Sequence, residues 1–64
     1  MVKINGEMLE KGGMTVADVL AEMGTSSQRV AVELNENIVP KTEYSSTVLK
    51  DGDVVEVVRF VGGG

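Results

Sequence analysis

The chain has 64 residues and no cysteine or histidine. One small domain is the upper bound, and disulfides, thiol nucleophiles, imidazole acid–base groups and the usual transition-metal ligands are excluded. A formal net charge of −4 with only two aromatic residues argues against nucleic acid and anionic membranes as partners, and favours a positively charged surface on another protein.

No apolar run approaches the length needed to cross a membrane, and no charged and apolar leader opens the chain. We therefore expect a cytoplasmic protein that does not bind membranes.

The opening of the chain predicts a β-hairpin. Val2 and Ile4 alternate with a polar residue, and Asn5-Gly6 accepts positive φ at both centres of a tight turn. The return strand is expected to begin at Met8 and to end before the glycine pair that follows.

A short helix is predicted next. Thr15 is a good N-cap, Asp18 three residues on makes a shortened capping box, and Gly24 suits the position just past the last turn. The apolar residues in between follow the spacing of one helix face: Val16, Val19, Leu20 and Met23. Because two turns of helix cannot stand alone in water, this helix must lie across a sheet.

A half-buried strand is predicted in the middle of the chain. Val30, Val32 and Leu34 alternate with less apolar residues and share one face. A turn is expected at residues 35–37, with Asn37 in the left-handed conformation.

The segment after this turn is less regular. Ile38 and Val39 are expected to be apolar anchors, and Pro40 to limit further strand pairing. A short edge strand is expected between Tyr44 and Val48. A second turn signal, Lys50 to Asp53, precedes the last strand, which runs into the terminal glycines.

This order of elements predicts an α+β fold with one helix on one face of a mixed sheet of four or five strands. That architecture is the β-grasp of ubiquitin-like domains. We expect one domain over residues 1–61, followed by a flexible glycine tail at residues 62–64.

Side chains offer little for catalysis. Four serines lie in predicted loops without an activating base in the pattern: Ser26, Ser27, Ser45 and Ser46. Asp51 and Asp53 flank a glycine, but the rest of a calcium loop is absent, so a turn explains them better. We predict that the protein is not an enzyme and binds no metal or cofactor of its own.

The last strand has two faces. If Val55 and Val57 point toward the helix, the period of two places Val58 and Phe60 on the opposite, solvent face beside the glycines. Single exposed apolar residues are common. An aromatic residue and a valine next to the tail nevertheless favour a docking patch for a partner that also handles the tail.

The tail presents one reactive group, a carboxylate on Gly64. Gly62 and Gly63 lack Cβ atoms, so the last residues can thread a narrow channel and reach about 10 Å from the domain. Condensing the carboxylate with ATP to an acyl-adenylate makes AMP a leaving group, and sulfide can then displace it to give a thiocarboxylate. The alternative is an inert, flexible end.

Six stretches together resemble, in order and from end to end, the ThiS family of sulfur carriers in thiamine biosynthesis. They are NGE, TVADVL, VAVELN, IVP, LKDGDVVEVV and the terminal VGGG. The Gly-Gly end is shared with other ubiquitin-like proteins, whereas the combination of IVP, DGD and their close spacing to Gly-Gly is more specific.

The resemblance implies that an activating enzyme related to ubiquitin E1 uses ATP to adenylate the carboxylate of Gly64. Sulfur relayed from cysteine through a persulfide enzyme would convert the adenylate to a thiocarboxylate, which thiazole synthase would use to build the thiazole of thiamine. Gly63 and Gly64 match the family's functional end and Gly62 extends it. The protein would be a co-substrate rather than a catalyst.

Four alternatives stay open. The small subunit of molybdopterin synthase shares the fold and the thiocarboxylate chemistry, although it is typically longer. The chain could carry sulfur for another pathway, such as cysteine synthesis or tRNA thiolation. It could be a ubiquitin-like modifier joined through Gly64 to lysines of target proteins. It could also be a non-reactive binding module that uses Val58 and Phe60.

Overall fold

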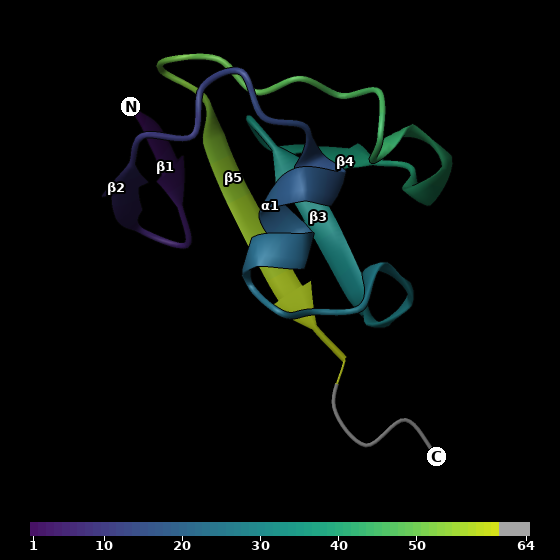
Figure 1. Cartoon of the computed structure of the whole chain (residues 1–64). Coiled ribbons are helices and arrows are strands. Elements are labelled where there is room, and N and C mark those ends of the chain that lie inside the picture. Colours follow the sequence, from purple (N-terminus) through teal and green to yellow (C-terminus); the bar gives the residue numbers. More distant parts are fainter. Residues whose placement is uncertain (61–64) are drawn as a thin grey trace.

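The computed structural model describes residues 1–60 (Figure 1). The predicted domain boundary after residue 61 and the tail at residues 62–64 lie outside the described residues. Within the described range, the elements are β1 (Val2–Ile4), β2 (Glu7–Leu9), α1 (Val16–Glu22), β3 (Val30–Leu34), β4 (Asn37–Val39) and β5 (Val54–Arg59). Two 3₁₀ turns, Ser27–Arg29 and Lys41–Glu43, precede β3 and follow β4.

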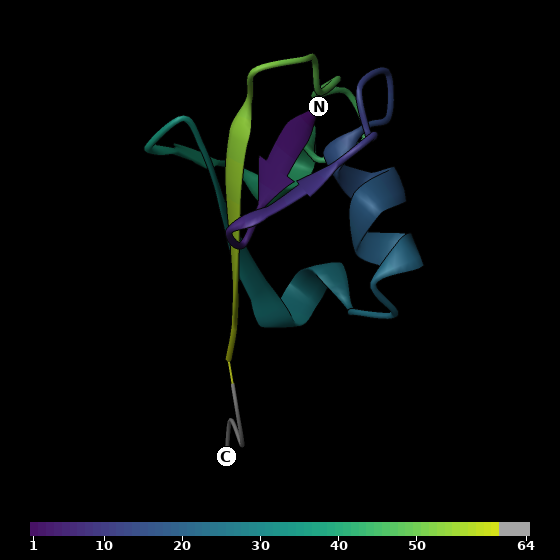
Figure 2. The same ribbon diagram turned by 90° about the vertical axis from the view of Figure 1, so that its left-hand side faces the viewer.

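The strands form one mixed sheet in the order β2-β1-β5-β3-β4. β1 and β5 pair in parallel, and the other neighbours pair antiparallel. Helix α1 covers one face of this sheet, as the two ribbon views show (Figures 1 and 2). The predicted β-grasp architecture, with one helix on a five-stranded mixed sheet, is confirmed.

The predicted N-terminal hairpin is confirmed, with its return strand beginning one residue earlier than expected, at Glu7. Asn5 and Gly6 have φ of 50° and 85°, as a tight turn between two twisted strands requires. The side chain of Asn5 also continues the sheet, because its Oδ1 accepts a hydrogen bond from the Val57 N–H at 2.8 Å. The hairpin is thereby joined to β5 beyond the end of β1.

The predicted capping box of α1 is present. The Asp18 N–H donates to Thr15 Oγ1 at 3.1 Å, and the Thr15 N–H donates to Asp18 Oδ2 at 3.2 Å. The chain leaves the helix at Gly24, which has a φ of 70°. A helix of seven residues is marginal alone, so its stability comes from packing onto the sheet.

The hydrophobic core lies between α1 and the inner face of the sheet. Its members are Val2, Ile4, Val16, Val19, Leu20, Val30, Val32, Val39, Tyr44, Leu49, Val55 and Val57. β1, β3 and β5 each contribute alternate residues, which is the two-residue period expected of a sheet with one buried face.

The turn between β3 and β4 differs from the expected one. The positive φ angles fall at Asn35 (51°) and Glu36 (71°), while Asn37 already belongs to β4. The prediction of a left-handed Asn37 was wrong because a two-residue hairpin loop takes positive φ at its two central residues. Asn37 instead closes the turn, with its Nδ2 donating to the Asn35 carbonyl at 3.3 Å.

The two predicted anchors after this turn point in opposite directions. Val39 is buried, as predicted, but Ile38 is 74% exposed. The prediction for Ile38 was wrong because consecutive residues of a strand face opposite sides of the sheet, and β4 places only one of the two inward.

The predicted edge strand between Tyr44 and Val48 was also wrong. Pro40 leads into a 3₁₀ turn, and the Tyr44 N–H closes it on the Lys41 carbonyl at 3.2 Å. Tyr44 is almost fully buried, and Val48 forms only an isolated bridge with Thr15. The edge of the sheet is instead β4, which the sequence pattern did not separate from the preceding turn.

Candidate functional site

The end of β5 carries the two residues predicted to dock a partner. Val55 and Val57 face the core, whereas Val58 and Phe60 are 53% and 55% exposed, so the predicted division of the strand is confirmed. Pairing with the neighbouring chain segment continues to the last described residue, because the Phe60 N–H donates to the Arg29 carbonyl at 2.8 Å. Phe60 is therefore held at the point where the described chain ends. Gly62, Gly63 and Gly64 lie outside the described residues.

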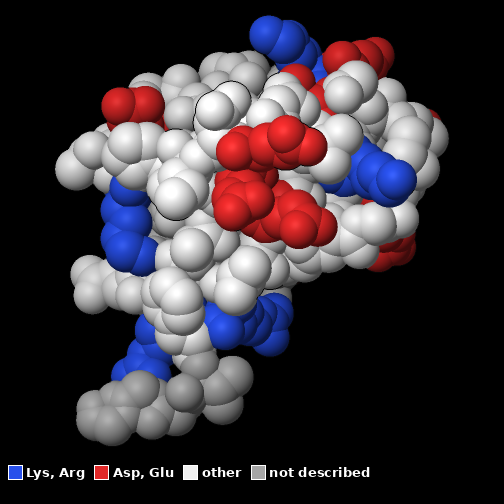
Figure 3. Space-filling model, turned by 180° about the vertical axis from the view of Figure 1, so that it is seen from behind, with Lys and Arg blue, Asp and Glu red and all other residues white. Residues whose placement is uncertain are grey.

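The surface opposite the helix, which we call the outer face, is largely apolar. Its exposed apolar residues come from three of the strands and from the residue after β5: Met8, Ile38, Val54, Val58 and Phe60. Figure 3 shows this side of the molecule, with uncharged residues around a group of carboxylates near the middle and basic residues toward the margins. Val58 and Phe60 thus belong to a larger surface than the patch that the sequence predicts.

Sequence reasoning did not find the two acidic residues in this surface as a pair. Glu33 of β3 and Glu56 of β5 are both exposed and are register partners across the antiparallel ladder. Each could be assigned to the solvent side from its own strand pattern. Their juxtaposition depends on which strands pair and in which register, and the sequence pattern contains no signal for that.

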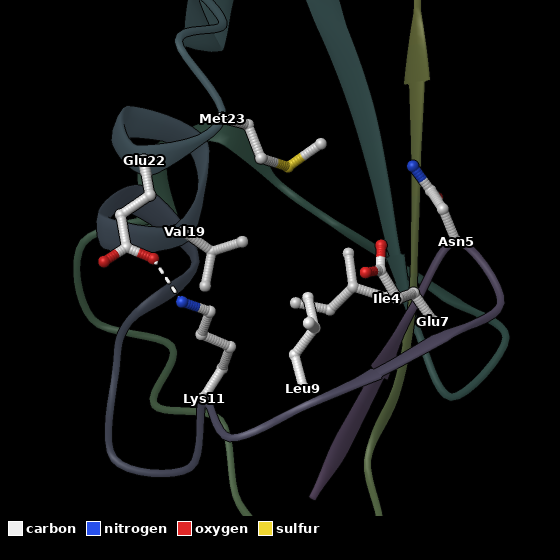
Figure 4. A pocket seen from close by; sticks show the side chains of 8 residues that line it. All are labelled: Ile4, Asn5, Glu7, Leu9, Lys11, Val19, Glu22 and Met23. Atoms are coloured by element: carbon white, nitrogen blue, oxygen red, sulfur yellow. Dashed lines mark hydrogen bonds and ion pairs between the residues drawn. The ribbon is translucent and has the colours of Figure 1, made fainter.

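The helix side of the molecule carries a separate pocket of about 280 Å³ between α1 and the hairpin. Figure 4 shows Leu9 and Met23 among its apolar lining, and Lys11 and Glu22 at its edge. Lys11 Nζ lies 2.7 Å from Glu22 Oε1. This ion pair links the segment between β2 and α1 to the end of the helix, across the pocket. Val58 and Phe60 are not among its lining residues.

The loop with the two predicted turn aspartates lies at the start of β5. The Met1 ammonium group lies 2.8 Å from Asp51 Oδ1, and this hydrogen bond, together with the attraction of the charge, lowers the pKa of Asp51 below its usual 3.8. Asp53 is buried and accepts hydrogen bonds from the Lys50 N–H and from Asn35 Nδ2. Both carboxylates therefore have structural partners, as the turn interpretation predicts.

The predicted loop serines are partly accounted for by local backbone contacts. Ser26 Oγ accepts from the Gln28 N–H at 3.3 Å, and Ser46 Oγ donates to the Glu43 carbonyl at 3.3 Å. Over residues 1–60 there is no cluster of three or more acidic side chains that could hold a metal ion. Of the helices in the described part of the chain, none is long and apolar enough to cross a membrane.

Comparison with known proteins extends the structural description. The crystal structure of a thiamine biosynthesis protein, ThiS, from Geobacter metallireducens superposes with a TM-score of 0.77 and 30% sequence identity, covering 98% of this chain and 97% of that one. The sulfur carrier protein ThiS of Thermus thermophilus is 47% identical over 64 residues, which are the whole of both chains. A thiazole synthase of Paramagnetospirillum magneticum is 48% identical over 62 residues, and this chain spans only 19% of its length.

The fold and these neighbours define the protein as a ubiquitin-like β-grasp domain of the kind found in thiamine biosynthesis. The sequence profile of the ThiS family matches residues 2–64, nearly the entire chain. The chain belongs to the ThiS family.

Proposed function

We propose that this protein is the sulfur carrier for the thiazole of thiamine, and that it carries sulfur as a thiocarboxylate on Gly64. The observation that supports this most directly is the extent of the family match, which runs through residue 64 and includes the terminal glycines. The full-length similarity to the Thermus thermophilus sulfur carrier protein supports the same role.

The chemistry takes place at the terminal carboxylate. A carboxylate oxygen of Gly64 attacks the α-phosphorus of ATP, forming an acyl-adenylate and releasing pyrophosphate. The outer sulfur of a persulfide, formed from cysteine on a persulfide enzyme, then attacks the acyl carbon, and AMP leaves. A thiol reduces the resulting acyl disulfide and so releases the sulfur as the thiocarboxylate. The product is a C-terminal thiocarboxylate, so the carrier itself supplies no catalytic group and needs no bound cofactor. Its ATP is consumed by the partner, and we place the reaction in the cytoplasm.

Two kinds of partner follow from this chemistry. An E1-like adenylating enzyme must bind the domain and admit Gly62, Gly63 and Gly64 to its active site. We propose that Val58 and Phe60 are part of the docking surface, because both are more than half exposed and lie only a few residues before the tail. A thiazole synthase is the proposed acceptor of the sulfur, in keeping with the similarity of this chain to part of an enzyme of that name.

The test is the mass of the C-terminal tryptic peptide after incubation with ATP, a sulfur donor and a bacterial adenylating and persulfide enzyme pair. Cleavage after Arg59 yields the peptide from Phe60 to Gly64, which contains none of the four methionines. This separation matters because methionine oxidation adds nearly the same nominal mass as replacing oxygen by sulfur. We expect the heavier peptide, and we expect it to react with an alkylating agent.

A reaction without ATP and a chain lacking Gly64 are the matched controls, and both should give no thiocarboxylate. An unmodified peptide in the presence of enzymes that activate another carrier would contradict the proposal. Adducts in which Gly64 is joined to lysine side chains would instead identify a ubiquitin-like modifier.

A further inference from the structure

We infer, on the basis of the proposed function, that Glu33 and Glu56 form the central contact of the outer face. Their partner is a basic side chain that the adenylating enzyme presents within an apolar surface. Val58 and Phe60 would then be one part of a contact that also includes this pair.

The register places the two carboxylates side by side. Glu33 and Glu56 are direct partners in the β3–β5 ladder. The Asn35 N–H donates to the Val54 carbonyl and the Phe60 N–H to the Arg29 carbonyl, and alternation along an antiparallel ladder then makes Glu33 and Glu56 a hydrogen-bonded pair. Their Cα atoms are therefore about 5.5 Å apart, with both side chains on the outer face. Like charges in directly opposed positions destabilise a sheet.

Lys3 of β1 lies on the same face beside β5, but it is not within ion-pair distance of either glutamate. The ion pairs found in residues 1–60 join Lys11 to Glu22 and the Met1 ammonium to Asp51, and neither involves the outer-face glutamates. The Lys41 ammonium lies at the Val30 end of β3, where it donates to the carbonyls of Ser27 and Val30. The free domain thus keeps two adjacent negative charges without a cation in ion-pair distance among its described side chains.

Apolar side chains surround the pair on the neighbouring strand positions. Ile38 of β4 is the register partner of Glu33 on its other side and is 74% exposed. Val54 and Val58 stand two residues before and after Glu56 on the same face of β5. The space-filling view of this side shows acidic residues near the middle, with uncharged residues and basic residues beside them (Figure 3).

Charge complementarity identifies the occupant. A guanidinium or ammonium group between the two carboxylates would turn their mutual repulsion into attraction to a shared cation, and an arginine fork can donate to both. The surrounding apolar side chains would exclude water when covered, which strengthens that contact and matches the arrangement of a binding hot spot. The competing role for charges in an apolar sheet face is to keep copies of the chain from associating.

The experiment uses Glu33→Gln, Glu56→Gln and the double variant in the full chain, with Glu10→Gln as the control. Glu10 is exposed and follows β2 away from the pair, so its substitution makes the same change in charge. Each variant is assayed for melting temperature, for Kd with a purified E1-like adenylating enzyme at low and high salt, and for self-association by sedimentation. ATP–pyrophosphate exchange at saturating carrier reports adenylation separately.

We expect the double variant to melt about 2–6 °C higher than the wild type, because the like-charge repulsion is removed. We expect its Kd to weaken about tenfold or more and to lose most of its salt dependence, whereas Glu10→Gln changes neither property appreciably. If the two glutamates were only solvated and contacted no partner, the double variant would not combine a higher melting temperature with weaker binding to the enzyme.

An unchanged Kd in the double variant would overturn the inference while leaving the sulfur-carrier proposal intact, as long as exchange persists. Self-association of that variant with unchanged Kd would assign the pair to keeping copies apart, which also overturns it. Tight binding of the wild type without ATP-dependent exchange would contradict the proposed thiocarboxylate chemistry alone. Failure of the wild type to bind the enzyme would overturn both.

Discussion

At the scale of single residues, Asp53 is the polar group on which the described fold depends most. It is only 5% exposed, and it is the buried charged residue of residues 1–60. Its Oδ1 accepts from Asn35 Nδ2 at 3.1 Å and its Oδ2 from the Lys50 N–H at 3.0 Å. Asn35 in turn accepts from the Val54 N–H at 2.9 Å. One carboxylate therefore links the β3–β4 turn to the loop before β5.

We predict that Asp53→Ala lowers the free energy of unfolding by about 1–3 kcal/mol, because it leaves a partly buried amide and a backbone N–H without an acceptor. Urea denaturation followed by circular dichroism measures this loss. The control is Asp51→Ala, whose side chain is 84% exposed and should matter less. Equal losses in the two variants would show that the buried hydrogen bonds are not the cause.

The turn residues show which backbone conformations can be predicted from the sequence. The positive φ of Asn5 and Gly6 is predictable, because that dipeptide suits a tight hairpin turn. The left-handed Glu36 is not, since a glutamate has no intrinsic preference for that conformation. It is held there by the pairing of the flanking strands and by the contacts of Asn35, and these form only once the chain has folded.

At the scale of elements, β5 combines two functions on its two faces. It lies in the middle of the sheet between β1 and β3, and its inward residues Val55 and Val57 complete the core. Its outward residues contribute to the surface that we propose for docking. Because the two sets alternate along one strand, substitutions a few residues apart should separate stability from binding.

We predict that Phe60→Ala weakens binding to the adenylating enzyme about tenfold or more and changes the free energy of unfolding by less than about 0.5 kcal/mol. Val55→Ala, from the buried face of the same strand, should cost about 2 kcal/mol of stability. Chemical denaturation and calorimetric binding titrations measure the two effects. If Phe60→Ala destabilised the domain as much as Val55→Ala, the loss of binding could not be assigned to a docking contact.

The elements also differ in how well the sequence predicts them. The helix was predictable because its cap and its apolar spacing agree with each other. The segment from Tyr44 to Val48 reads as a strand because tyrosine, threonine and valine favour strands. Tertiary contacts override that preference, since Tyr44 closes a 3₁₀ turn and buries its ring in the core. β4 has only three residues, too few for a period of two to be distinguished from a turn.

At the scale of the whole molecule, the two ends of the central strand β5 have different roles. β1 and β5 run in parallel, so the Met1–Asp51 ion pair and the buried Asp53 lie where both strands begin. β5 then continues past the Asn5–Gly6 turn toward Phe60 at the opposite end of the sheet (Figures 1 and 2). This arrangement separates the loops that hold the sheet together from the end at which we propose the chemistry.

That separation gives a prediction for the chain that lacks Gly64. Every member of the core cluster lies between Val2 and Val57, so removing one terminal glycine should shift the melting temperature by less than about 2 °C. We expect the truncated chain to bind the adenylating enzyme through Val58 and Phe60 with a Kd within a few-fold of the wild type.

The truncated chain should nevertheless form no thiocarboxylate, because its carboxylate would stand one residue, about 3.5 Å, short of the reacting position. Thermal melting, binding titration and the mass of the C-terminal peptide test these three expectations on one variant. A chain extended by one glycine tests the same requirement in the other direction. Its carboxylate would lie one residue beyond the reacting position, so we expect it to form no thiocarboxylate either. Sulfur transfer by either variant at the wild-type rate would show that the site tolerates a displaced carboxylate, and the assignment of the chemistry to Gly64 would be wrong.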